Sequence, residues 1–316
     1  MRFHEITEAK FSKPEIFYHG TSKKHLPSIL KHGLRADKTG SGWSGSERGN
    51  VYMRGLKSYG GVYMTDNIDR SYVAASAASD LNRDGITVII QFQPRSGVLD
   101  EDTVEKEIAE HLEEDLGAHA MPRFLNDLNQ DPDAVIDNIF DSSENLEIFG
   151  EAVDTIPHGR KILTQFLKVY AIRIIAYMVL DPSEWDLDDE YVNNPPVPIP
   201  DTQTAEAQYR NELDKISRLF KKLAYDKNYQ MDRGTRSIRS FEDITFTGTN
   251  RIIGIVDNED KPDENGEITH RILYGQVPKQ AVDDFSTLHD GKFVQFAKNG
   301  KIVASGVGPE REDEDF

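Results

Sequence analysis

The chain of 316 residues contains no cysteine, so disulfide bonds and thiolate metal ligands are excluded, as is typical of proteins from a reducing compartment. Basic side chains are also in deficit, because 37 Lys and Arg stand against 55 Asp and Glu, a net charge of -18. Such a surface repels a phosphate backbone, so extended nucleic-acid binding is not expected. The remaining composition, 37% hydrophobic and 29% charged, is that of a folded globular protein.

Long hydrophobic runs are scarce. The longest, KILTQFLKVYAIRIIAYMVL at 161–180, is interrupted by Lys168 and Arg173. We interpret it as a buried helix, with a passage into a strand at IIAYMVL as the alternative, and we expect no membrane span. The first residues, MRFHEITEAKF, are charged and predict no signal peptide, so a soluble cytoplasmic protein is expected.

The spacing of apolar residues predicts strand-rich ends around a helical middle. Short strands and helices alternate at the start: strands at 15–21, 60–66 and 86–94, and helices at 26–33 and 67–81. Residues 103–234 are mainly helical, and acidic from 103 to about 160, with a Pro-rich loop at 186–204 and an amphipathic helix at 205–228. The pattern predicts an α+β protein whose β-core is interrupted by a helical insertion.

Strand patterns return in the last third of the chain, at 235–277. A C-terminal β appendage is expected at 278–308, where Asn299-Gly300 is the tight turn of a hairpin. Residues 1–14 are an N-terminal extension, and 309–316 are an acidic tail.

Three stretches place polar or aromatic side chains at the ends of the predicted strands near the start: YHGTS at 18–22, GGVYMTDNIDRSYVAA at 60–75 and RSGVLDEDTV at 95–104. Strand ends and the loops after them are where chemistry is usually carried. A nucleotide with an aromatic amide as its leaving group would use all three stretches. The Gly20 backbone could bind the amide, the Tyr63 ring could stack on the aromatic group, and His19 could bind a ribose hydroxyl.

Cleavage of an N-glycosidic bond develops positive charge on the sugar, which a carboxylate can stabilise while it deprotonates an acceptor. The run Asp100-Glu101-Asp102 supplies the carboxylates. The alternative for this run is structural, because acidic residues favour a helix N-terminus. Tyr63 could likewise be only a half-buried strand residue, and His25 and His32 are interpreted as helix residues without a role.

Together, His-Gly-Thr after a strand, Gly-Val-Tyr-x-Thr before an alanine-rich helix and a later acidic run resemble the ADP-ribosyltransferases. The resemblance is to the His-Tyr-acid branch, which includes poly-ADP-ribose polymerase-like and diphtheria-toxin-like enzymes, and the motif spacing is similar to the compact rifampin ADP-ribosyltransferases. It covers about 15–102 and roughly 235–277, where TRSIRSFEDI resembles the Arg-rich closing strand. It implies a split β-core, NAD+ as substrate and transfer of ADP-ribose to an acceptor, for which a protein is expected.

The resemblance also implies roles for individual residues. The expected catalytic residues are His19, Tyr63 and Asp102, with Glu101 one position away as the other acid. The expected NAD+ contacts are Tyr18, Gly20, Thr21, Ser22, Tyr72 and Arg239. Of these, Arg239 could bind the pyrophosphate, with a structural ion pair as the alternative. Asp100, Glu242 and Gln276 stay open as residues that complete the site, and no metal is expected.

Two further functions stay open. The stretch HEITEA resembles the Ile-x-Glu sites cut by phage head-maturation proteases, and phages package transferases of this family. A phage-encoded protein would act in the host cytoplasm or travel in the virion, and a non-catalytic virion-associated or interaction protein could keep the fold. The RNA 2'-phosphotransferases share a Tyr-His-Gly-Thr stretch but carry a basic domain ahead of it, which the acidic balance here disfavours. The sequence indicates neither the acceptor nor the oligomeric state.

Overall fold

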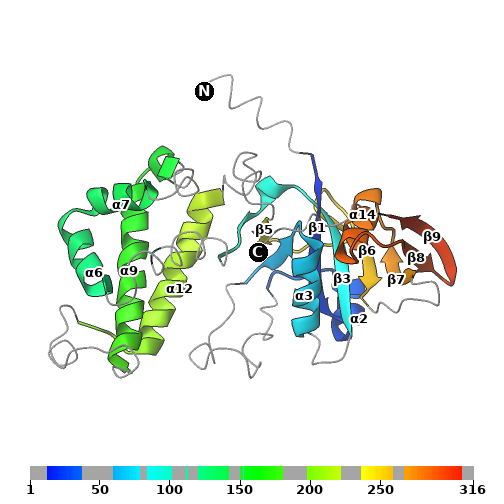
Figure 1. The fold of residues 1–316 in the computed structure, drawn as a ribbon, viewed down its shortest axis with the longest axis horizontal. Helices are drawn as coiled ribbons and strands as arrows, with labels where there is room; N and C mark the ends of the chain where they lie inside the picture. Colours follow the sequence, from blue (N-terminus) through cyan, green and yellow to red (C-terminus); the bar gives the residue numbers. More distant parts are fainter. Residues whose placement is uncertain are drawn as a thin grey trace, which may run out of the picture. The chain divides into compact units, whose positions relative to one another are not determined.

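The computed structural model describes residues 13–37, 60–78, 84–101, 112, 120–141, 150–151, 153–180, 198–221, 236–258 and 267–307. They form a mixed α+β protein with an open sheet of nine strands (Figure 1). The chain divides into two compact units, residues 1–39, 60–97 and 234–316, and residues 40–59 and 98–233. Each unit is described by itself below.

The sheet has the strand order β4-β5-β2-β1-β3-β6-β7-β8-β9. Its strands are β1 (Glu15–Ser22), β2 (Val62–Thr65), β3 (Gly85–Phe92), β4 (Val98–Leu99), β5 (Ser237–Ser240), β6 (Arg251–Asp257), β7 (Ile268–Gly275), β8 (Val294–Lys298) and β9 (Lys301–Gly306). Among the described pairings between two named strands, only β7 with β8 is parallel. The sheet is therefore mostly antiparallel.

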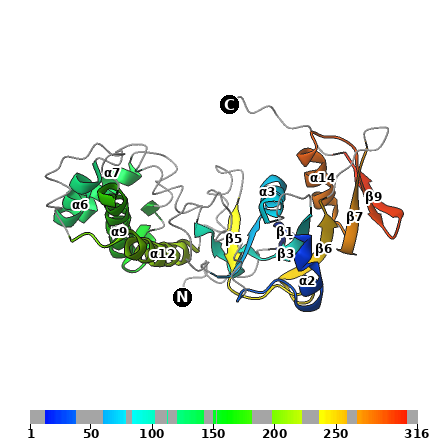
Figure 2. The ribbon, with the colours of Figure 1, turned by 90° about the horizontal axis from the view of Figure 1, so that it is seen from below.

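Strand β3 lies at the centre of the sheet. Its apolar run GITVIIQF suits this place, because it is buried along nearly its whole length. β3 pairs with β1 over eight residues, from Glu15↔Phe92 to Ser22↔Gly85. Helices α3 (Ile68–Ala78) and α14 (Lys279–Leu288) lie side by side over one face of this sheet (Figure 2). Between them lies a buried core that includes Tyr18, Ile68, Ile89, Val256, Ala281, Phe285 and Phe296.

Most elements expected in this first unit are confirmed. Helix α2 (Leu26–His32) ends at Gly33, whose φ of 77° lies in the left-handed region that favours glycine. The hairpin turn is confirmed by positive φ at Asn299 (53°) and Gly300 (74°), as a two-residue turn requires. Helix α14 was not predicted, because residues 278–308 were interpreted as β structure alone.

The second unit is helical over most of its described residues, with α6 (Met121–Gln130), α7 (Pro132–Phe140), α9 (Gly159–Leu180) and α12 (Thr202–Leu219). The predicted buried helix at 161–180 is confirmed, and the strand alternative at IIAYMVL is wrong because α9 runs unbroken to Leu180. Helix α12 begins before the predicted 205–228 and ends at Leu219, and residues 222–228 of that prediction lie outside the described residues.

Helix α9 is the one described helix long and apolar enough to cross a membrane by length and composition, yet more than half of that stretch is buried. Its aromatic residues pack on α12, with the Phe166 and Tyr209 ring centroids 5.7 Å apart. Arg173 of α9 donates to the buried carboxylate of Glu206 at 2.7 Å and lies 4.4 Å from the Tyr209 ring. The charged side chain of Arg173 in α9 thus has its partners in α12, as expected for the core helix of a globular unit.

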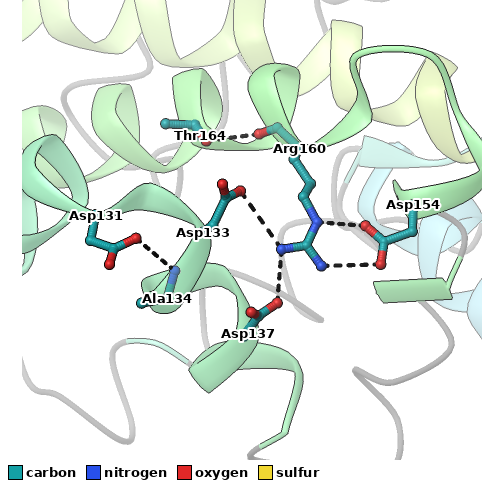
Figure 3. Close-up of polar contacts among 7 residues, drawn as sticks. All are labelled: Asp131, Asp133, Ala134, Asp137, Asp154, Arg160 and Thr164. Carbon is teal, nitrogen blue, oxygen red and sulfur yellow. Dashed lines mark hydrogen bonds and ion pairs between the residues drawn. The ribbon is translucent and has the colours of Figure 1, made fainter.

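A single arginine joins α7, α9 and the segment before α9 (Figure 3). Arg160 donates to both carboxylate oxygens of Asp154, at 2.6 and 3.0 Å, and to Asp137 at 2.8 Å. Asp133 lies 3.7 Å from the same guanidinium. The hydrogen bond from Arg160 holds the pKa of Asp154 below its ordinary value.

We expect Arg160→Gln to lower the free energy of unfolding by about 1 kcal/mol at pH 7, because it leaves three carboxylates without their shared cation. A carboxyl with a lowered pKa contributes stability above its unfolded pKa of about 3.9 and loses it as the pH falls through the folded value. The difference between variant and wild type in urea unfolding should therefore shrink below about pH 4. Arg123→Gln, which removes an exposed pair with Asp127 at 3.8 Å, is the control. An equal effect of the two changes at pH 7 would contradict the prediction.

Candidate functional site

His19 of β1 is held by a bond to the neighbouring strand β2. Its Nδ1 lies 2.6 Å from the Tyr63 carbonyl oxygen. Because a carbonyl only accepts, Nδ1 carries the proton and Nε2 of the neutral ring is an acceptor. Burial lowers the pKa of His19, the bond to Tyr63 raises it and the charge of His25 lowers it, with a net shift below the ordinary value. At neutral pH the ring is therefore neutral and offers Nε2 to a hydroxyl donor.

The same place is where β1 and β2 part. β1 pairs with β3 along its whole length, whereas its described pairing with β2 is the single position Tyr18↔Thr65. β2 in turn pairs with β5 from Val62↔Ser240 to Thr65↔Ser237. Beyond Tyr18 the His19 side chain makes the described link between the two strands. The His19 side chain is thus brought to the backbone of Tyr63, the other residue that the sequence assigned to this site.

Gly20 lies under helix α3. A Cβ atom at this position would stand 1.8 Å from the Ser71 carbonyl oxygen and 2.7 Å from the Ala75 nitrogen. No other residue allows this approach of helix backbone to strand backbone, because the clashing atoms belong to the backbone of α3. Gly20 therefore has a packing role, which the sequence argument did not consider.

Tyr18 points into the layer between the sheet and the helices. It is fully buried, and its hydroxyl donates to the carboxylate of Asp284 in α14. Burial raises the pKa of the Tyr18 hydroxyl, and the charge and hydrogen bond of Asp284 raise it further. Burial also raises the pKa of Asp284. Because side chains alternate along a strand, His19 points to the face opposite Tyr18 and Gly20.

Tyr63 is half-buried and sits directly opposite Arg239 of β5. The guanidinium carbon of Arg239 lies 5.9 Å from the centroid of the Tyr63 ring and 4.6 Å from that of Phe241. Arg239 was expected to bind the pyrophosphate, but its exposed fraction is 0%. The structure thus places Arg239 against the ring of Tyr63 and not at the surface.

Two other predicted NAD+ contacts, Ser22 and Tyr72, have hydrogen-bond partners within the fold. Ser22 is buried and caps the turn after β1, with Oγ accepting from the Lys24 nitrogen at 3.4 Å, and Thr21 is half-buried. The Tyr72 hydroxyl in α3 donates to the Asn258 carbonyl at 2.7 Å. Tyr72 therefore fixes α3 to the end of β6 through its hydroxyl.

The acidic residues are distributed between the two units. Asp102 lies outside the described residues. Glu101, with an exposed fraction of 1%, and the half-buried Asp100 belong to the second unit. Glu242 and Gln276 belong to the first unit and are both exposed.

Sequence reasoning missed a partly buried charged cluster at the end of β2. Arg236 donates to Asp66 through its backbone nitrogen at 2.6 Å and its Nε at 2.7 Å, and it also bonds Glu15. Its guanidinium lies 5.1 Å from the Phe17 ring. This cluster fixes the end of β2 to the start of β5. Only the pairing of these strands brings Arg236 and Asp66 together, so no local signal could have revealed it.

Among the described residues no group of three or more His, Asp or Glu side chains could hold a metal ion. Comparison with protein-family models, with curated proteins and with solved structures finds no match. The candidate site is therefore defined by its own geometry: a neutral histidine bonded to the backbone of a tyrosine, at the point where two antiparallel strands separate.

Proposed function

We propose that the protein is a mono-ADP-ribosyltransferase that binds NAD+ and transfers ADP-ribose to a protein acceptor, releasing nicotinamide. In this proposal the nine-stranded sheet is an ADP-ribosyltransferase-like core and residues 103–234 are an insertion into it. The observation that carries the proposal is the bond from His19 Nδ1 to the Tyr63 carbonyl. It unites the first two residues of the His-Tyr-acid order and leaves His19 Nε2 as an acceptor.

In the proposed reaction these residues position the substrate and stabilise the charge that develops on it. The bond between C1' of the ribose and the nicotinamide nitrogen breaks, and its electron pair leaves with nicotinamide. A lone pair of the acceptor atom forms the new bond to C1', and the acceptor's proton passes to a carboxylate. His19 Nε2 would accept a hydrogen bond from a ribose hydroxyl, and Tyr63 would stack on the nicotinamide ring.

The carboxylate is assigned to Asp102 or Glu101 on the resemblance alone. An ionised carboxylate stabilises the positive charge that develops on the sugar, and it can take the acceptor's proton. The variants Asp102→Asn and Glu101→Gln remove the charge but keep the shape of each side chain, so they show which of the two is the catalytic carboxylate. Nicotinamide release should fall only in the variant that lacks the catalytic carboxylate.

The test is NAD+ turnover by the purified full-length chain. NAD+ labelled on the adenylate part is incubated with the protein and a cell lysate, and free nicotinamide is measured in parallel. Label on protein together with nicotinamide release is the expected result, and it should disappear with one of the two acid variants. A chain that releases no nicotinamide and binds no NAD+ in calorimetry would overturn the proposal.

A further inference from the structure

The ring of Tyr63 belongs to a stack of three flat groups. Arg239 is the direct cross-strand partner of Tyr63, and its guanidinium lies within 6 Å of two ring centroids, 5.9 Å from Tyr63 and 4.6 Å from Phe241. A guanidinium at this distance is attracted to the face of an aromatic ring. The stack runs from the half-buried Tyr63 through the buried Arg239 to Phe241, whose exposed fraction is 37%.

The backbone beside the stack is shaped to admit the arginine. Gly61 has a φ of 99°, in the region that favours glycine. A Cβ at Gly61 would stand 2.8 Å from Cγ and 3.0 Å from Cδ of Arg239. The stem of Arg239 therefore passes through the space that the missing side chain leaves. The position of the guanidinium near the Tyr63 and Phe241 rings depends on this glycine.

Tyr63 is consequently held at two points. Its carbonyl accepts from His19, and its ring is covered on one side by Arg239. A ligand that stacks on Tyr63 must use the other face, and the orientation of that face is set by the guanidinium. A ring that is already held in place spares the free-energy cost of ordering it on binding, so stacking contributes more to affinity.

We infer that Arg239, supported by Phe241, is a positioning residue that orients the Tyr63 ring for stacking against the nicotinamide part of the substrate. The inference rests on the proposed function and changes the role of Arg239 from a pyrophosphate ligand to a support for Tyr63. The full burial of Arg239 favours the second role, because a residue that grips a phosphate must reach it.

Separate titration of the two halves of NAD+ tests the inference. Nicotinamide and ADP-ribose are titrated individually into the full-length protein and into Arg239→Lys and Phe241→Leu. Arg239→Lys keeps the charge but loses the flat group, and Phe241→Leu alters only the exposed end of the stack. Each variant should bind nicotinamide about tenfold more weakly, while ADP-ribose affinity stays within about twofold. Arg251→Lys, at an exposed arginine of β6 that contacts Gln91, is the control and should change neither affinity.

The outcomes separate this inference from the proposed function. A fall in ADP-ribose affinity in Arg239→Lys, or unchanged nicotinamide affinity in both variants, would overturn the positioning role. Wild-type protein that binds neither ligand would overturn the proposed function instead. The flipping rate of the Tyr63 ring, measured by NMR on labelled tyrosine, then decides the positioning role without a ligand. It should rise in both stack variants, and an unchanged rate would refute the role.

Discussion

His19→Ala is expected to lower the rate of nicotinamide release from NAD+ by about a hundredfold or more, because it removes a preorganised hydrogen-bond acceptor from the site. The side chain also links β1 to β2 through the Tyr63 carbonyl, so its loss frees the two strands where they part. His32→Ala, on the exposed side of α2, should retain the wild-type rate. Circular dichroism and thermal unfolding of both variants would show that the fold is intact.

The dependence of this rate on pH follows from the lowered pKa of His19. A histidine whose folded pKa lies below the ordinary value of about 6.5 is neutral throughout the range above it. Protonation at lower pH removes the Nε2 acceptor, so the rate should be level across neutral pH and fall only on the acid side of 6.5. A loss of rate that begins above this value, or full activity in His19→Ala, would contradict the assignment of His19.

The largest effect on stability is expected for Gly20→Ala, which should lower the free energy of unfolding by about 3 kcal/mol. The new methyl group meets the Ser71 carbonyl oxygen and the Ala75 nitrogen, and backbone atoms cannot turn away as a side chain can. Helix α3 must move off the strand as a whole. Urea unfolding monitored by circular dichroism would measure the change.

A substitution at Gly300 shows how much an alanine costs through backbone strain alone, without a packing clash. Gly300 has a φ of 74°, yet a Cβ there would meet nothing within 4 Å. Gly300→Ala should therefore cost only about 1 kcal/mol, the strain of a left-handed alanine. If Gly20→Ala proved no more costly than Gly300→Ala, the close packing of α3 on β1 would be refuted.

The elements that the sequence predicted well are those with a strong local pattern. The run GITVIIQF ends before Pro94, and the Asn299-Gly300 pair demands positive φ, so β3 and the hairpin could be located without a structure. Helix α14 was missed although its apolar residues Ala281, Val282, Phe285 and Leu288 recur at helical spacing. The local signal was present, and the interpretation of 278–308 as β structure alone overlooked it.

The candidate site, too, has features that the sequence predicted and features that depend on long-range contacts. The order of motifs placed His19 and Tyr63 together, and the structure has them in contact. The position of Arg239 could not be predicted, because it depends on the register Tyr63↔Arg239 and on the space at Gly61. The partner of the Tyr18 hydroxyl was equally hidden, since local patterns say nothing about a residue near the other end of the chain.

That hydroxyl bond to Asp284 joins residues 266 positions apart. During synthesis β1 and helix α3, which packs on it, leave the ribosome early, but α14 follows only after nearly the whole remaining chain. At typical elongation rates this delay is roughly 15 to 50 s. A nascent or C-terminally shortened chain would carry β1 and α3 without α14, so the core around the Tyr18 hydroxyl is completed only when translation is almost finished.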